Sequence, residues 1–179
     1  MKQILLSSFF AVIALSATAQ IKTTTSATVA FDATTPIDAL PKAENKTVVA
    51  MLNTLTGELG FEAGVNNFAF TNPTIQQHFN SERWLNSGKF PLFTFSGKIT
   101  NLKEVKFGKD GTYPVTVAGT LTIKEKSNPI STTATITVKE GSIQAGSSFT
   151  FKLSDFGIEV GAQGKIANEP KITVSTDFK

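Results

Sequence analysis

The sequence predicts an all-β protein of about eight antiparallel strands with one short helix, arranged as a barrel or a sandwich. Two observations lead to this prediction. Apolar and polar residues alternate along most of the chain, which is the period of a half-buried strand. Gly, Pro and Asn interrupt the alternation at roughly regular intervals, as turns do in barrels and sandwiches. Only the stretch at about Pro73–Asn86 has the spacing of a helix.

The first 19 residues are expected to be a signal peptide that is removed. Lys2 gives a basic start, Ile4–Leu15 is apolar, and Ala17-Thr18-Ala19 is an A-x-A cleavage site. The apolar run is too short to span a bilayer, and no cysteine follows the cleavage site to carry a lipid anchor. We therefore expect an exported protein, periplasmic or secreted and not lipid-anchored, whose single mature domain is residues 20–179.

Three segments ahead of the helix alternate between apolar and polar residues: Ala27–Ala33, Lys46–Asn53 and Glu58–Ala63. Before them, the polar and threonine-rich Gln20–Ser26 is expected to be a loose lead-in. Thr34–Pro41 contains two prolines, which exclude it from the interior of a sheet. At Gly64–Asn67 the apolar positions change from odd to even numbers, so we expect a bulge or a break there.

The helix has a clear beginning. Asn72 is a good N-cap, and Pro73 suits the first helical position, where no N–H is needed. Four residues then recur at spacings of three and four and share one face: Ile75, His78, Phe79 and Glu82. We expect the helix to end near Asn86, because Gly88 accepts the left-handed geometry of a helix end and Pro91 forbids continuation.

Five further segments alternate after the helix and complete a count of eight strands: Phe93–Ile99, Tyr113–Ile123, Ile130–Val138, Ile143–Leu153 and Ile172–Phe178. Turns are expected between them at Asn101–Gly111, at Lys126–Pro129 and at Gly141. Successive strands joined by short turns indicate an antiparallel meander.

Composition excludes several kinds of chemistry. The chain has no cysteine, which removes disulfides, thiolate catalysis and cysteine-based metal sites. His78 is the only histidine, whereas zinc needs three or four converging ligands, so we expect neither a metal nor a cofactor. No nucleophile, base and acid come together in a motif, and we expect no enzyme. The lysines are scattered, which argues against a nucleic-acid partner.

The inward faces suggest a lumen. A barrel of about eight strands either fills with side chains or holds one small ligand. Phenylalanines lie among small residues on these faces, which gives an apolar wall with room beside it. An aromatic stripe at period two is more often packed core, so a filled interior stays open as the alternative. The candidate lumen residues are Phe61, Phe68, Phe70, Phe79, Phe93, Phe95, Val117, Leu121, Phe149 and Phe151.

Several motifs resemble those of the YceI-like family, periplasmic or secreted β-barrels that bind lipids such as polyisoprenoids. His78-Phe79-Asn80 is followed by K-F-P-x-x-x-F-x-G-K-I at Lys89–Ile99. Gly111–Ile123 resembles the family's G-x-Y-x-V-x-G-x-L-T-I strand, and Ser154–Ile158 its later S-D-[YF]-x-I turn. The resemblance covers Ala27–Phe178, which is almost the whole mature chain.

The resemblance implies a lipocalin-like barrel that sequesters an amphiphilic isoprenoid lipid, such as a polyisoprenoid or an isoprenoid quinone. Its apolar tail would enter the lumen, and its head group would meet His78, Asn80 and Trp84 at the rim. Alternatively, His78 only pairs with Glu82 or braces the rim. The rival functions are a secreted β-sandwich with a filled core and no ligand, which is structural or binds another protein, and a lipid hydrolase that uses His78. An oligomer and a transient contact with a membrane surface stay open.

Overall fold

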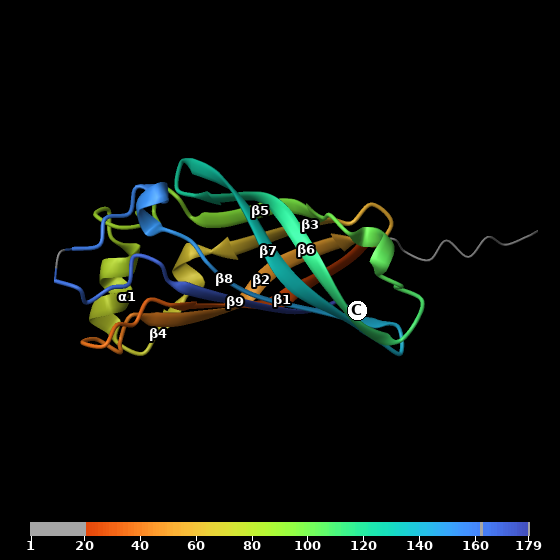
Figure 1. The fold of residues 1–179 in the computed structure, drawn as a ribbon. Coiled ribbons are helices and arrows are strands. Elements are labelled where there is room, and N and C mark those ends of the chain that lie inside the picture. The colour runs from red at the N-terminus through yellow and green to blue at the C-terminus, as the bar shows by residue number, and fades with distance from the viewer. Residues whose placement is uncertain (1–20, 162, 179) are drawn as a thin grey trace, which may run out of the picture.

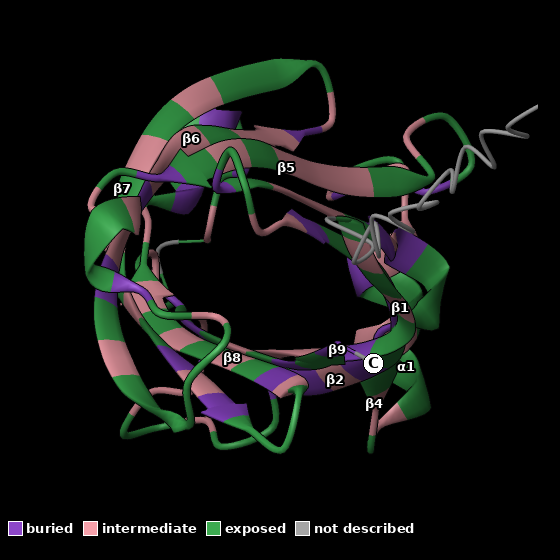
Figure 2. Ribbon diagram, turned by 90° about the vertical axis from the view of Figure 1, so that its right-hand side faces the viewer, coloured by how far each residue is buried: buried purple, intermediate pink, exposed green. Residues whose placement is uncertain are grey.

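Eight antiparallel strands form one closed ring in the computed structural model, which describes residues 21–161 and 163–178 (Figure 1). The ring order is β1-β9-β8-β7-β6-β5-β3-β2, and pairing of β1 with β2 closes it, as the view along the barrel shows (Figure 2). The predicted barrel is confirmed, and the sandwich alternative is wrong. The predicted signal peptide lies outside the described residues. The ring strands are β1 Ile21–Asp32, β2 Lys42–Asn53, β3 Glu58–Gly64, β5 Leu92–Ile99, β6 Gly111–Ile123, β7 Lys126–Lys139, β8 Ser142–Thr150 and β9 Lys171–Phe178.

The barrel has two different ends. At the end on the left of Figure 1, here called the helix end, lie the helix α1, Pro73–Asn80, and the two-residue strand β4, Ala69–Phe70, which pairs with β2. Two 3-10 turns, η1 Val65–Asn67 and η3 Leu153–Phe156, lie at the same end. At the opposite end, here called the hairpin end, the strands are joined by turns and by the 3-10 turn η2, Leu102–Glu104.

The buried core is divided between these two ends. Inward side chains at the hairpin end are fully packed: Leu52, Ile99, Ile136, Ile143 and Phe178. At the helix end the buried side chains include Val65, Phe68, Phe79 and Leu85. Between the two packed layers, many inward side chains of the ring strands are only partly buried, among them Phe61, Phe95 and Phe149. This difference leaves the middle of the barrel hollow.

The helix is shorter than predicted. It ends at Asn80 and not near Asn86, because Ser81 takes an extended conformation. The Ser81 hydroxyl and N–H both donate to the carbonyl of His78, which satisfies the helix end without a glycine. Glu82 therefore lies outside the helix, and no hydrogen bond or ion pair joins it to His78 among the described residues.

Two strand limits also differ from the prediction. The expected lead-in is strand from Ile21 onward, because its β-branched threonines favour extended backbone and pair with β2. The expected turn at Lys126–Pro129 lies inside β7, and the real turn is at Lys124 and Glu125, where Lys124 has φ +57°. The break predicted at Gly64–Asn67 is confirmed, since η1 and β4 follow Gly64 where the apolar register changes.

Candidate ligand-binding cavity

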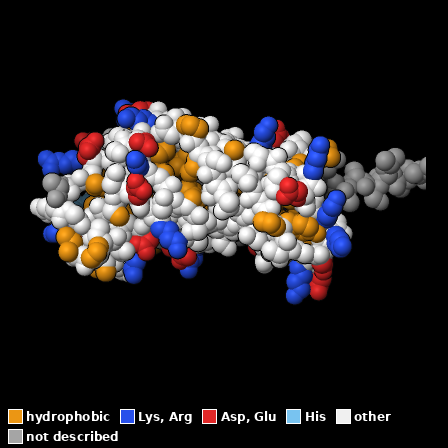
Figure 3. Space-filling view, in the orientation of Figure 1, with side chains coloured by type: hydrophobic (Ala, Val, Ile, Leu, Met, Phe, Trp, Pro, Cys, Tyr) orange, Lys and Arg blue, Asp and Glu red, His pale blue; other side chains and the backbone are white. Residues whose placement is uncertain are grey.

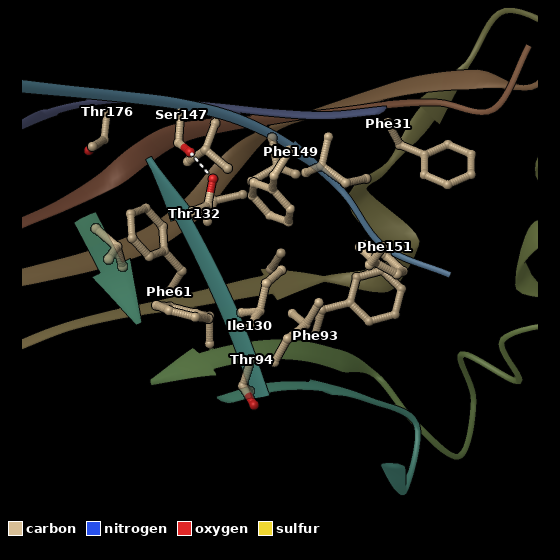
Figure 4. A pocket seen from close by; sticks show the side chains of 18 of the residues that line it. Phe31, Phe61, Phe93, Thr94, Ile130, Thr132, Ser147, Phe149, Phe151 and Thr176 are labelled. Carbon is tan, nitrogen blue, oxygen red and sulfur yellow. Dashed lines mark hydrogen bonds between the residues drawn. The ribbon is translucent and has the colours of Figure 1, made fainter. Parts of the chain in front are cut away.

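A cavity of about 180 Å³ occupies the hollow middle of the barrel, and all eight ring strands contribute to its lining. In the close view, Phe61, Phe93 and Phe149 point into the shared space (Figure 4). These aromatic side chains are only partly buried although they face inward, because they border the cavity. An engineered apolar cavity of about 150 Å³ is enough to hold a benzene molecule. The interior of this barrel is therefore not filled, in contrast to the packed-core alternative.

Nine of the ten candidate lumen residues line this cavity: Phe61, Phe68, Phe79, Phe93, Phe95, Val117, Leu121, Phe149 and Phe151. The tenth, Phe70, does not line it. Phe70 is on β4, outside the ring, and its ring packs on Phe79 with 4.8 Å between centroids. The placement of Phe70 in the lumen was wrong because η1 takes the chain out of the ring after Gly64.

The three candidate rim residues are separated. Trp84 lines the cavity, but His78 and Asn80 do not. His78 is exposed on α1. The Asn80 side chain donates to the carbonyl of Gln76, one turn back in the same helix. The structure therefore brings only Trp84 to the place where a ligand would lie, and a head-group role for the other two has no support from the geometry.

Sequence reasoning passed over other lining residues. Val29 and Phe31 on β1, and Ile130, Ala134 and Ala145 on β7 and β8, all line the cavity. Most of them lie on faces that were predicted to point inward, but mainly phenylalanines were predicted to line the lumen. The alternation was the signal that could have found them, because every inward position of a hollow barrel borders the lumen.

Aromatic side chains close the helix end of the cavity around Phe79. Its ring lies 5.9 Å from Phe31, 5.8 Å from Phe68 and 5.9 Å from Trp84, between centroids. Gln76 attaches α1 to the segment before it, because its side chain accepts from the N–H of Phe70 and donates to the carbonyl of Phe68. The helix is thus held over this end of the barrel and presents the ring of Phe79 to the lumen.

Two paired glycines shape the barrel wall where β5 meets β6. Gly97 on β5 and Gly119 on β6 are register partners. A Cβ atom on Gly119 would lie 2.6 Å from Cζ of Phe95, and one on Gly97 would lie 2.7 Å from the same atom. The Phe95 ring therefore lies against bare backbone, which no other residue type would permit.

Asp32, the last residue of β1 at the helix end, has a lowered pKa. Its carboxylate accepts hydrogen bonds from the Thr34 hydroxyl and from the Thr34 N–H, and these bonds hold its pKa below the usual value. Because folding lowers this pKa, the hydrogen bonds of Asp32 stabilise the folded barrel above the pKa that Asp32 has in the unfolded chain. This stabilisation is lost as the pH falls through the pKa of the folded state. Asp32 is exposed and points away from the lumen.

The described residues contain no group of three or more His, Asp or Glu side chains that could hold a metal ion. No helix in the described ranges is both long and apolar enough to cross a bilayer. Among the described lining residues, none has a charged side chain. This uncharged lining is suited to holding an apolar group.

We predict that Thr176→Val raises the free energy of unfolding by about 1 kcal/mol. Thr176 is 5% exposed, and its hydroxyl has no hydrogen-bond partner within the described part of the chain. Valine has nearly the same shape and removes the unsatisfied group. Urea unfolding of both proteins measures the change, and Thr173→Val, on the outer face of β9, is the matched control. A loss of stability in Thr176→Val would contradict this interpretation.

The model of the YceI-like domain matches residues 10–178. No curated protein sequence matches this chain.

Solved structures resemble the barrel closely. A polyisoprenoid binding domain from Saccharophagus degradans, implicated in plant cell wall breakdown, has a TM-score of 0.75 at 12% identity and covers 89% of this chain and 98% of its own. BcnA of Burkholderia cenocepacia has a TM-score of 0.70 at 17% identity, with 84% and 95% covered. The YceI protein of Campylobacter jejuni has a TM-score of 0.58 at 19% identity, with 74% and 80% covered. At these identities the likeness establishes the shared fold.

Proposed function

This chain belongs to the YceI-like domain family, and from that membership and its cavity we propose that it binds an amphiphilic lipid, with the apolar tail inside the barrel. The observation that carries the proposal is the hollow, apolar and uncharged lining among the described residues. Each buried methylene contributes about 0.8 kcal/mol before ordering costs. Even one five-carbon isoprene unit in the cavity therefore contributes about 4 kcal/mol before those costs. The polyisoprenoid binding domain from Saccharophagus degradans, which shares the fold, supports an isoprenoid as the ligand class.

We propose sequestration and not catalysis. His78, the only histidine of the chain, lies outside the cavity and is exposed. Hydrolysis by a serine or threonine needs a base beside the nucleophile. The hydroxyls that line the cavity, on Thr132, Ser147 and Thr176, have no such neighbour among the described lining residues. A carrier needs only the apolar wall, which this barrel has.

We also propose that the protein is exported and works without a lipid anchor. The proposal is supported by the basic, apolar and A-x-A segments of the first 19 residues. Ligand would be taken up during transient contact with a membrane surface, for which Ile37 and Leu40 offer exposed apolar side chains at the helix end. The intact mass of protein purified from its own host tests export. We expect loss of residues 1–19 and no added lipid mass that survives denaturation.

Quenching of Trp84 tests the binding proposal directly, because Trp84 is the only tryptophan and lines the cavity. A fatty acid brominated in the middle of its chain is expected to quench its fluorescence to saturation at one molecule per protein. Farnesol added in excess should restore the fluorescence by displacement. A short brominated acid of four carbons is the control and should quench only weakly and without saturation. Equal, unsaturable quenching by both acids would contradict binding in the barrel.

A further inference from the structure

The barrel wall opens between β7 and β8. Their register runs from Lys139↔Ser142 at the hairpin end to Ala134↔Ser147, and then it stops. Both strands continue toward the helix end with their other neighbours. β7 stays paired with β6 as far as Lys126, and β8 stays paired with β9 as far as Thr150. The two strands therefore diverge, as Figure 1 shows, and leave a gap in the wall, here called the β7–β8 window, with edges at residues 126–133 and 148–151.

The window is framed at its wide end as well. After β8 the chain enters η3, and the Asn128 side chain of β7 donates to the carbonyl of Asp155 in η3, at 3.1 Å. The side chain of Lys126 lies close to Gly157, since a Cβ atom there would be 3.1 Å from Nζ. Figure 3 shows apolar side chains in a hollow of the surface at this place, between the β6–β7 turn and η3.

The cavity reaches this window. Ile130 and Thr132 face inward on β7, and Ser147, Phe149 and Phe151 face inward from the other edge; all of them line the cavity and all are partly exposed. The helix end is closed by the aromatic cluster around Phe79, and the hairpin end by the packed layer that includes Phe178. The lumen is therefore accessible from the side of the barrel.

Two of the four hydroxyls on lining residues lie together at the end of the window where the pairing of β7 with β8 stops. Oγ of Ser147 donates to the carbonyl of Thr133 at 2.8 Å, and Oγ1 of Thr132 lies 3.3 Å from Oγ of Ser147 and 3.2 Å from the same carbonyl. The lining includes two further threonines. The Thr94 side chain points away from the lumen in Figure 4, and the Thr176 hydroxyl is enclosed by protein.

The hydrogen bonds of this pair define what it can recognise. A hydroxyl has one hydrogen to donate and two lone pairs that accept. Both hydroxyl hydrogens have acceptors within the protein, on Thr133 or between the pair. The two oxygens add almost nothing to the surface of the cavity itself. What remains for a ligand is therefore their acceptor capacity at the window, in an uncharged apolar setting. The group that fits this site is an uncharged hydrogen-bond donor at the end of an apolar chain, which is an alcohol.

We propose that the β7–β8 window binds the hydroxyl end of an isoprenoid alcohol, with Thr132 and Ser147 accepting its hydrogen bond while the tail lies in the cavity. The head group then lies at the side of the barrel and not at the helix-end rim near His78. This inference rests on the proposed function, because it names the ligand class and the polar subsite of the same cavity.

The test compares farnesol with farnesyl methyl ether, which has the same chain but no hydroxyl hydrogen. We expect the unmodified protein to bind the alcohol five- to tenfold more tightly. The variant with both Thr132→Val and Ser147→Ala should lose this preference and bind the two compounds equally. Thr132→Val alone should reduce the preference, and this single variant replaces the double variant in the test if the double variant does not fold. Thr133→Val removes an exposed hydroxyl from the outer face of β7, next to Thr132, and should keep the full preference.

The outcomes separate the two proposals. An unchanged preference in the double variant, or a preference lost in Thr133→Val, overturns the window as the head-group site while lipid binding stands. Equal binding of the two compounds by the unmodified protein overturns it in the same way. Failure of the unmodified protein to bind either compound overturns the proposed function itself, and the window proposal with it.

Discussion

Ala134→Trp is expected to weaken lipid binding at least 100-fold while the barrel stays folded. Ala134 faces inward on β7, lines the cavity and is only partly buried. A new indole ring at this position enters free space, and indole is larger than the benzene molecule that a cavity of about 150 Å³ holds. The cavity of this barrel is about 180 Å³. Little room then remains for a tail.

Displacement of a fluorescent apolar probe measures this loss, and thermal unfolding verifies the fold. Thr133→Trp is the matched control, because Thr133 is the next residue on the same strand and is exposed. We expect its affinity to stay within about twofold of the unmodified protein, since surface changes usually alter free energies by less than about 0.5 kcal/mol. A folded Ala134→Trp protein that binds as tightly as the unmodified one would exclude the cavity as the binding site.

Gly119→Val is expected to destabilise the barrel by more than about 3 kcal/mol, at the upper end of the usual cost of overpacking. A Cβ atom on Gly119 would lie 2.4 Å from the carbonyl oxygen of Ser96 and 2.5 Å from the Cα of Gly97, which are backbone atoms of the neighbouring strand. Backbone cannot turn away as a flexible side chain can. Either β5 and β6 separate, or Phe95 leaves its place on the wall.

Urea unfolding measures this destabilisation. Gly108→Val is the control, because Gly108 lies in a loop and a Cβ atom there would meet nothing within 4 Å. We expect the control to change stability by less than about 0.5 kcal/mol. If Gly119→Val were as stable as the control, the close approach of β5 and β6 at this pair would be wrong.

Local patterns were sufficient to predict most of the barrel. Each ring strand buries one face, so its apolar residues alternate, and the eight strands could be recognised one by one. The helix start was equally local, since the Asn72 side chain accepts from the N–H groups of Thr74 and Ile75. The helix end was missed because a Ser81 side chain, and not a glycine, satisfies the last turn.

The site was only partly predictable. Alternation places a side chain inside a barrel but does not say whether the barrel is filled there, because that depends on how the opposite walls meet. The β7–β8 window could not be predicted for the same reason. Ile130 and Thr132 on β7, and Phe149 on β8, keep a regular alternation beyond Ala134, yet the two strands no longer pair. Their divergence is a property of the closed ring and not of either segment.

Native mass spectrometry of the protein, purified from its own host without detergent, tests lipid binding most directly. We expect a species heavier than the polypeptide by the mass of one lipid, which organic extraction releases and which Ala134→Trp lacks. An unmodified protein that shows only the polypeptide mass, and still does so after incubation with isoprenoid alcohols and fatty acids, would contradict the account.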